Sequence, residues 1–157
     1  MSESGTAPAA KAEMLIRRPV AEVFEAFVDP AITVKFWFTS GSARLEAGHD
    51  VRWEWNMYDF TLTVQVLEVE PNQRIVIDWP TGNGTSRVTW TFTALDAGET
   101  FVSIVNDRFP GTAEDVVAQA IGATEGFAFV LAGLKAWLEQ RIKLELVRDR
   151  FPKGLSS

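Results

Sequence analysis

The chain has 157 residues, of which 46% are hydrophobic and 23% are charged, and its formal net charge is -6. This length suffices for one domain whose core is stable without a bound metal or a disulfide bond. The acidic balance and the scattered Lys and Arg residues argue against a nucleic-acid partner. The chain contains no cysteine, which excludes disulfides, thiolate metal sites and a cysteine nucleophile.

The two ends of the chain differ in composition from its middle. Residues 1–10 are small and polar and lack the regions of a signal peptide, so we expect a disordered tail there. A cysteine-free chain of this kind is compatible with a cytoplasmic location, which we expect. The most apolar run, Phe127 to Leu134, is too short to cross a bilayer, so we expect no membrane insertion. One domain over 11–150 and a tail over 151–157 complete the expected organisation.

The first elements are a strand and two short helices. The strand is expected over Lys11–Arg17. A helix then begins near Pro19, which a first helical turn tolerates, and its apolar residues repeat at helical spacing. Asp29 and Pro30 are typical of a cap and a first helical position, so a second short helix is expected to reach Phe36. The apolar residues of the first helix are Val20, Val23, Phe24 and Phe27.

The middle of the chain alternates apolar and polar residues with period two, which indicates strands with one buried face. We expect about six antiparallel strands in all, and the parity change at Leu67 predicts a bulge that curves the sheet. In the last strand, Phe101 and Val105 compete with Val102 and Ile104 for the inward face. Beyond the first, the expected strands are 49–57, 60–69, 75–79, 87–93 and 100–108, with turns at 71–72, 80–84 and 96–98.

From Thr112 to about Val147 the pattern is helical. A continuous helix over 113–147 would be roughly 50 Å long at about 1.5 Å per residue. Its apolar stripe is wide enough to cover a curved sheet, and three glycines are expected to bend the helix or let it approach the sheet closely. We predict an α+β fold of one domain. The stripe consists of Val116, Ala120, Phe127, Leu131, Leu134, Leu138 and Ile142, and the glycines are Gly122, Gly126 and Gly133.

Several stretches carry a family resemblance, which covers about residues 11–145. They are 19–27 with 29–30 and 36–38, the strand–proline turn–tryptophan strand of 66–79, 106–110, and the final-helix pattern of 125–139. Together they resemble the SRPBCC (START/Bet v 1-like) superfamily and, within it, the AHSA1-like proteins, named after the activator of Hsp90 ATPase. Two departures stand out: Phe127 replaces the commoner Trp, and Asn106 with Arg108 replaces the usual acid-or-His and Gly.

The resemblance implies a helix-grip fold, in which a curved antiparallel sheet wraps around a long C-terminal helix, with two short helices after the first strand. It also implies a cavity between sheet and helix that accepts a small hydrophobic molecule. Composition alone does not decide whether the aromatic side chains line such a cavity or fill a core. The expected cavity residues are Phe24, Phe36, Trp37, Trp53, Trp55, Trp79, Trp90, Asn106, Arg108, Phe127, Leu131 and Leu134.

Two of these residues are polar and have two readings. If Val102 and Ile104 face inward, Asn106 and Arg108 follow them at the end of the last strand. There they either hold the polar group of a ligand at the cavity mouth or simply end the strand. His49 is the only histidine and is expected to be a solvated or core-edge residue. With one His and no Cys, we expect no metal site, and we expect no other cofactor. Glu54 and Asp78 are expected on the solvated face of the sheet.

Other functions remain open beside ligand binding. Some superfamily members are enzymes that cyclise or dehydrate aromatic precursors in the same cavity, and such chemistry needs a buried acid–base pair that we do not find. The AHSA1 name also implies a protein-interaction module associated with a chaperone. A homodimer through a strand edge, or through the apolar tail at Phe151 and Leu155, is a further alternative that the sequence does not decide.

Overall fold

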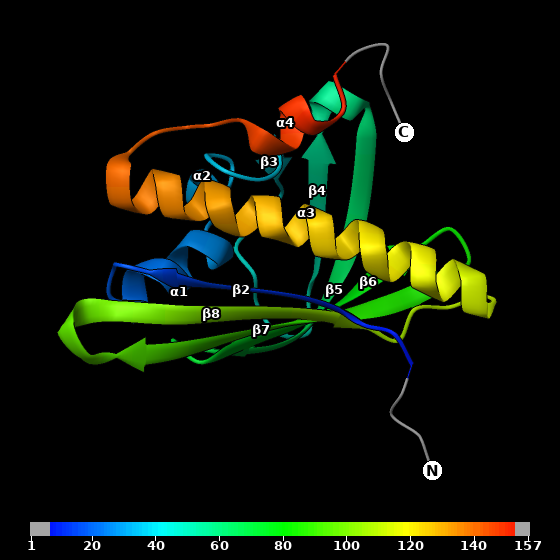
Figure 1. The fold of residues 1–157 in the computed structure, drawn as a ribbon, viewed down its shortest axis with the longest axis horizontal. Helices are drawn as coiled ribbons and strands as arrows, with labels where there is room; N and C mark the ends of the chain where they lie inside the picture. Colours follow the sequence, from blue (N-terminus) through cyan, green and yellow to red (C-terminus); the bar gives the residue numbers. More distant parts are fainter. Residues whose placement is uncertain (1–6, 153–157) are drawn as a thin grey trace.

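In the computed structural model, which describes residues 7–152, a seven-stranded antiparallel sheet is crossed on one face by a long helix (Figure 1). The strand order is β2-β8-β7-β6-β5-β4-β3. The α+β class predicted from the sequence is confirmed. In chain order the elements are β2 (Ala10–Ile16), α1 (Val20–Val28), α2 (Pro30–Thr33), β3 (Ser40–Gly41), β4 (Asp50–Trp55), η1 (Asn56–Tyr58), β5 (Phe60–Glu70), β6 (Arg74–Thr81), β7 (Gly84–Leu95), η2 (Asp96–Gly98), β8 (Glu99–Asp107), α3 (Ala113–Gln140) and α4 (Leu146–Arg150).

The sheet curves at the bulge that the sequence predicted. The register of β5 against β6 shifts between Val66 and Glu68, which leaves Leu67 as the extra residue. In β8, Val102 and Ile104 are fully buried while Phe101 is exposed, so the former pair faces inward. The structure thus decides between the two faces that the sequence left open for this strand.

Some predicted boundaries are wrong by a few residues. β2 begins at Ala10, within the stretch expected to be a tail, because Ala10 is buried and pairs with Asn106. Met57 lies in η1 and not in a strand, and β6 continues through Pro80 to Thr81, where the hairpin with β7 closes. The rest of the expected tails at 1–6 and 153–157, including Leu155, lies outside the described residues.

The long C-terminal helix is shorter than predicted. It ends at Gln140, because Arg141 adopts a left-handed conformation with φ 55°. The Arg141 N–H donates to the Trp137 carbonyl at 2.9 Å, which satisfies an end carbonyl of the helix. Glu145 is also left-handed, with φ 60°, and α4 then begins. Ile142 is consequently outside the helix and exposed, so it is not part of the apolar stripe.

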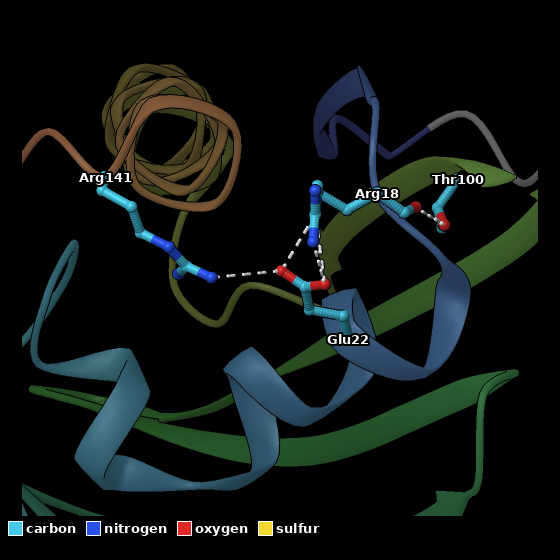
Figure 2. A network of polar contacts seen from close by, with 4 residues as sticks. All are labelled: Arg18, Glu22, Thr100 and Arg141. Atoms are coloured by element: carbon cyan, nitrogen blue, oxygen red, sulfur yellow. Dashed lines mark hydrogen bonds and ion pairs between the residues drawn. The ribbon is translucent and has the colours of Figure 1, made fainter.

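A polar network holds the turn after α3 against α1 (Figure 2). Glu22 lies between Arg18 and Arg141: the Arg18 guanidinium donates to both Glu22 carboxylate oxygens at 2.9 to 3.1 Å, and Arg141 Nη2 is 3.7 Å from Glu22 Oε2. The Thr100 hydroxyl donates to the Arg18 carbonyl at 2.8 Å, which ties the start of β8 to the same site. These contacts link the residue that ends α3 to the start of α1 and, through Arg18, to β8.

The two halves of α3 pack differently. In the C-terminal half, Val130, Leu131, Leu134 and Leu138 are buried against the core. In the N-terminal half, Ile121 is 67% exposed and Val117 is also exposed. The helix is therefore packed into the core mainly through its C-terminal half, and Ala120 is the buried residue of its N-terminal half.

The glycines of α3 follow the same division. A Cβ on Gly133 would lie 3.2 Å from Phe36 Cβ and 3.3 Å from the Phe36 carbonyl oxygen, so the absence of a side chain lets the helix contact the segment after α2 closely. A Cβ on Gly122 or Gly126 would meet nothing within 4 Å. The predicted close approach is thus made at Gly133 alone, and against Phe36 rather than the sheet.

By length and composition alone, α3 is the one helix among residues 7–152 that could cross a membrane. Its most apolar window has a mean hydropathy of 1.5. The core helix of a folded domain passes the same test, and the C-terminal half of α3 is packed in this way.

The packing at Gly133 yields a stability prediction. We expect Gly133→Leu to lower the free energy of unfolding by about 1–3 kcal/mol, because the new side chain overpacks the contact with Phe36. The matched variant Gly122→Leu gains helix propensity without a clash and should be at least as stable as the parent, by up to about 1 kcal/mol. Urea denaturation followed by circular dichroism measures both values. Equal destabilisation of the two variants would contradict the packing described.

A second contact fastens the C-terminal half of α3 to the end of β2. Glu139 Oε2 accepts hydrogen bonds from the Arg17 backbone N–H at 2.7 Å and from Lys135 Nζ at 2.8 Å. Lys135 Nζ also donates to the Leu15 carbonyl at 2.8 Å. Burial by itself would raise the pKa of Glu139, but these hydrogen bonds and the nearby positive charges outweigh it, and the pKa lies below its ordinary value of 4.5.

This lowered pKa predicts a pH-dependent contribution to stability. The ionised carboxylate stabilises the fold above pH 4.5, and the contribution is lost as the pH falls through the lower pKa of the folded state. We expect Glu139→Gln to reduce the free energy of unfolding by about 1 kcal/mol at pH 7 and by progressively less below pH 4.5. Denaturation curves at pH 7, 5, 4 and 3 test this, and a pH-independent difference would contradict it.

Candidate functional site

A cavity of about 860 Å³ lies beneath the N-terminal half of α3. Residues of η1 and of strands β4 to β8, with Trp37 and Phe109, form part of its wall, and α3, α4 and Phe151 contribute the rest. It occupies the place where α3 is not packed against the sheet, so the same feature that exposes Ile121 also creates the space.

Aromatic side chains form a rigid part of the wall. The rings of Trp37 and Trp79 are stacked, with centroids 6.1 Å apart and an angle of 16° between their planes. Trp55 lies 6.2 Å from Trp79, and Phe127 meets Trp79 edge-on at 6.2 Å. Because each ring is held by its neighbours, the wall is preformed and apolar.

The helix contributes small side chains to the opposite wall. Ala118, Gly122 and Gly126 recur at intervals of four residues and therefore lie on one face of α3. The space next to Gly122 and Gly126 is open, as the missing contacts around a Cβ show. Larger residues at these positions would fill part of the cavity.

Two buried polar side chains lie in the sheet side of the wall. Ser86 of β7 is 3% exposed and Asn106 of β8 is 5% exposed. Asn106 Nδ2 donates to Ser86 Oγ at 3.1 Å and to the Arg87 carbonyl at 2.9 Å. The carbonyl partner fixes which end of the amide is the nitrogen, since only the NH₂ group can donate to it.

The segment after α3 covers one side of the cavity. The Phe151 ring packs edge-on against Tyr58 at 6.0 Å, and Arg150 Nε donates to Glu125 Oε1. The Tyr58 hydroxyl is buried and has no hydrogen-bond partner among residues 7–152. Burial raises the pKa of Tyr58 above its ordinary value of 10.0, Arg150 opposes this increase and Asp149 adds to it. The phenol is therefore neutral at physiological pH.

The structure brings together some of the residues expected to line a cavity and places the others elsewhere. Phe36 lines a separate groove of about 520 Å³ beside Lys143 and Arg148, and Phe24 packs on Phe92 at 5.2 Å. Arg108 is exposed, with φ 62°, and lies outside the wall that residues 7–152 form. Those in the cavity wall are Trp37, Trp55, Trp79, Asn106 and Phe127, and those buried in the core are Trp53, Trp90, Leu131 and Leu134.

Several wall residues were not identified from the sequence. Ser86 sits on the buried parity of β7, where a polar residue among Val88, Trp90 and Phe92 was a usable signal. The spacing of Gly122 and Gly126 was visible but carried no information about what it faced. Phe151 is brought to Tyr58 by the turn after α3, which the sequence did not predict.

Other candidate residues play lesser parts. His49 is exposed, and no group of three or more His, Cys, Asp or Glu residues within 7–152 is placed to hold a metal ion. Asp78 and Glu54 are half-buried and paired, with Arg87 and with Ser40 and Arg52 respectively.

The family model described as activator of Hsp90 ATPase homolog 1-like protein matches residues 17–139. The chain belongs to this family. A search of curated proteins gave no match.

Solved structures agree with this membership. Protein SSP2350 of Staphylococcus saprophyticus is 34% identical, with a TM-score of 0.75 over 87% of this chain and 95% of its own. Protein MLL2253 of Mesorhizobium loti is 21% identical, with a TM-score of 0.74 over 85% and 98% of the two chains. The Aha1 dimer from Colwellia psychrerythraea is 15% identical, with a TM-score of 0.71 over 84% and 96%, and shows the likeness of fold alone.

Tyr58 is the only tyrosine of the chain, so its titration reports directly on how the segment after α3 covers the cavity. We expect tyrosinate absorbance at 295 nm to appear with a midpoint above pH 10.0, because Tyr58 is partly desolvated. Phe151→Ala removes the ring packed on Tyr58 and should shift the midpoint towards 10.0. Phe101→Ala, on the outer face of the sheet, is the matched control and should leave it unchanged, with circular dichroism confirming that each variant stays folded. An unshifted Phe151→Ala midpoint would mean that this ring does not shield Tyr58.

Proposed function

We propose that this AHSA1-like protein binds a small hydrophobic molecule in the cavity beneath the N-terminal half of α3. The observation that carries the proposal is the cavity of about 860 Å³ with its preformed aromatic wall. Cavities of about 300–1,000 Å³ that are mostly apolar and carry a few polar groups are typical of small-molecule sites.

The energetics favour an apolar occupant. A ligand that buries about 200 Å² of apolar surface gains on the order of 5 kcal/mol, at about 25 cal/mol per Å². The stacked Trp37 and Trp79 are already ordered by their neighbours, so binding needs little rearrangement of the wall. Gly122 and Gly126 let a flat molecule approach the helix backbone.

Catalysis receives less support from the wall. Its titratable side chains, within residues 7–152, are Tyr58, Glu125 and Arg150. Glu125 and Arg150 pair with each other, and the phenol of Tyr58 is neutral. A cyclase or dehydratase activity, like a chaperone-associated role, stays an expectation from the family resemblance.

Self-association and cellular location are separate proposals. The Aha1 protein of Colwellia psychrerythraea is described as a dimer. A homodimer of the present chain is testable by light scattering coupled to size-exclusion chromatography. The cytoplasmic location stays a prediction from the composition.

Ligand binding is tested with the neutral fluorescent probe N-phenyl-1-naphthylamine. We expect its emission to rise and shift to the blue on titration of the protein, because the probe leaves water for the apolar cavity. Gly126→Leu places a side chain in the cavity and should weaken binding by about tenfold or more. The change also raises helix propensity, so lost binding would not reflect lost folding.

The control variant is Ala128→Leu. Ala128 is exposed and lies outside the described wall, and the change adds the same side chain to the same helix. It should bind the probe as the parent does. Absence of binding to the parent protein, or equal binding by both variants, would overturn the proposed function.

A further inference from the structure

The cavity wall contains hydrogen-bonding capacity that the protein itself does not use. Within residues 7–152, Asn106 Nδ2 donates two hydrogen bonds, while Asn106 Oδ1 accepts none. Ser86 Oγ accepts from Asn106, and its own hydroxyl proton has no acceptor in the same part of the chain. Both side chains are more than nine-tenths buried and both line the cavity.

The geometry points to a ligand class: we propose that the cavity takes an apolar aromatic molecule carrying a neutral hydroxyl group, which donates to Asn106 Oδ1 and accepts from Ser86 Oγ. This inference rests on the proposed function and adds the chemistry of the ligand. One acceptor and one donor, side by side on neighbouring strands, match a hydroxyl group, which has one proton and two lone pairs.

The strand register holds this pair in place. Ser86 and Val88 share the inward face of β7, and Asn106 is the cross-strand partner of Val88. Trp79 is the cross-strand partner of Ser86 on β6. The polar pair therefore adjoins the aromatic wall, and a ring that contacts Trp79 can present its hydroxyl group to Ser86 and Asn106.

An anionic group fits this position poorly. A carboxylate would face the lone pairs of Asn106 Oδ1, and burying its charge without a cation is costly. The cation in the described wall, Arg150, belongs to α4 and is already paired with Glu125. The arrangement therefore selects a neutral polar group.

Tyr58 supplies the rival position, since its buried hydroxyl is also unpartnered within residues 7–152. Tyr58 offers a single hydroxyl group, whereas Ser86 and Asn106 together offer a donor and an acceptor. Tyr58 also lies in the 3₁₀ helix η1, whereas Ser86 and Asn106 lie in strands of the sheet. For these reasons the hydroxyl group is assigned to the sheet pair, and Tyr58→Phe tests the rival position.

Competition against bound N-phenyl-1-naphthylamine tests the assignment. The competitors are 4-phenylphenol, 4-methoxybiphenyl, biphenyl and biphenyl-4-carboxylate, which share one apolar body. We expect 4-phenylphenol to compete about tenfold better than biphenyl, since each satisfied group contributes modestly. The methoxy compound, which accepts but does not donate, should fall between them, and the carboxylate should be the weakest.

Two variants show which residues cause the preference for 4-phenylphenol over biphenyl. Ser86→Ala should reduce the advantage of 4-phenylphenol over biphenyl to about threefold or less, because the hydroxyl group of the ligand loses its donor. Tyr58→Phe should preserve the advantage. Loss of the advantage in Tyr58→Phe alone, equal competition by phenol and biphenyl, or strongest competition by the carboxylate would each overturn the hydroxyl assignment. In all three cases the probe still binds, so the proposed function stands. Failure of the probe and of every biphenyl to bind would overturn both.

Discussion

The contact between Gly133 and Phe36 is the constraint on which the cavity depends. It lets the C-terminal half of α3 lie directly against the segment after α2, with Leu131, Leu134 and Leu138 buried beside it. The hydrogen bonds of Lys135 and Glu139 to the end of β2 hold that half in place. The opposite half of the helix then extends beyond the core, and the space beneath it becomes the cavity.

The aromatic side chains have two roles that follow from this arrangement. Trp53 and Trp90 lie under the anchored part of the fold and are packed on all sides. Trp37 and Trp79 lie at the boundary, where one side of each ring meets the core and another part lines the cavity. A filled core and a lined pocket, which composition leaves as alternatives, therefore coexist in one continuous cluster.

The polar features of the cavity follow from its position at the edge of the packed region. Asn106 and Ser86 are buried by the sheet and yet open towards the cavity, so they retain unused hydrogen-bonding capacity. Tyr58 is sheltered by Phe151, which reaches it only because the chain turns back after α3. The orientation of a bound molecule would thus be set by few groups, and its affinity by the apolar wall.

The sequence by itself determined the class of fold, the buried face of the central strands and the membership suggested by its motifs, because these depend on local periodicity and turn chemistry. Two examples are the bulge between Val66 and Glu68 and the alternation of buried and exposed residues along β7, which contains Trp90. The inward face of β8 was decided only by the structure. The end of α3 was not predictable, since no glycine marks the left-handed residue Arg141, whose guanidinium lies beside the distant Glu22 in the folded chain. Likewise, only the tertiary structure decided which of the twelve expected residues line the cavity. Trp79 and Trp90 share one pattern and one parity, and only the tertiary packing around each ring decides that the first lines the cavity and the second lies in the core.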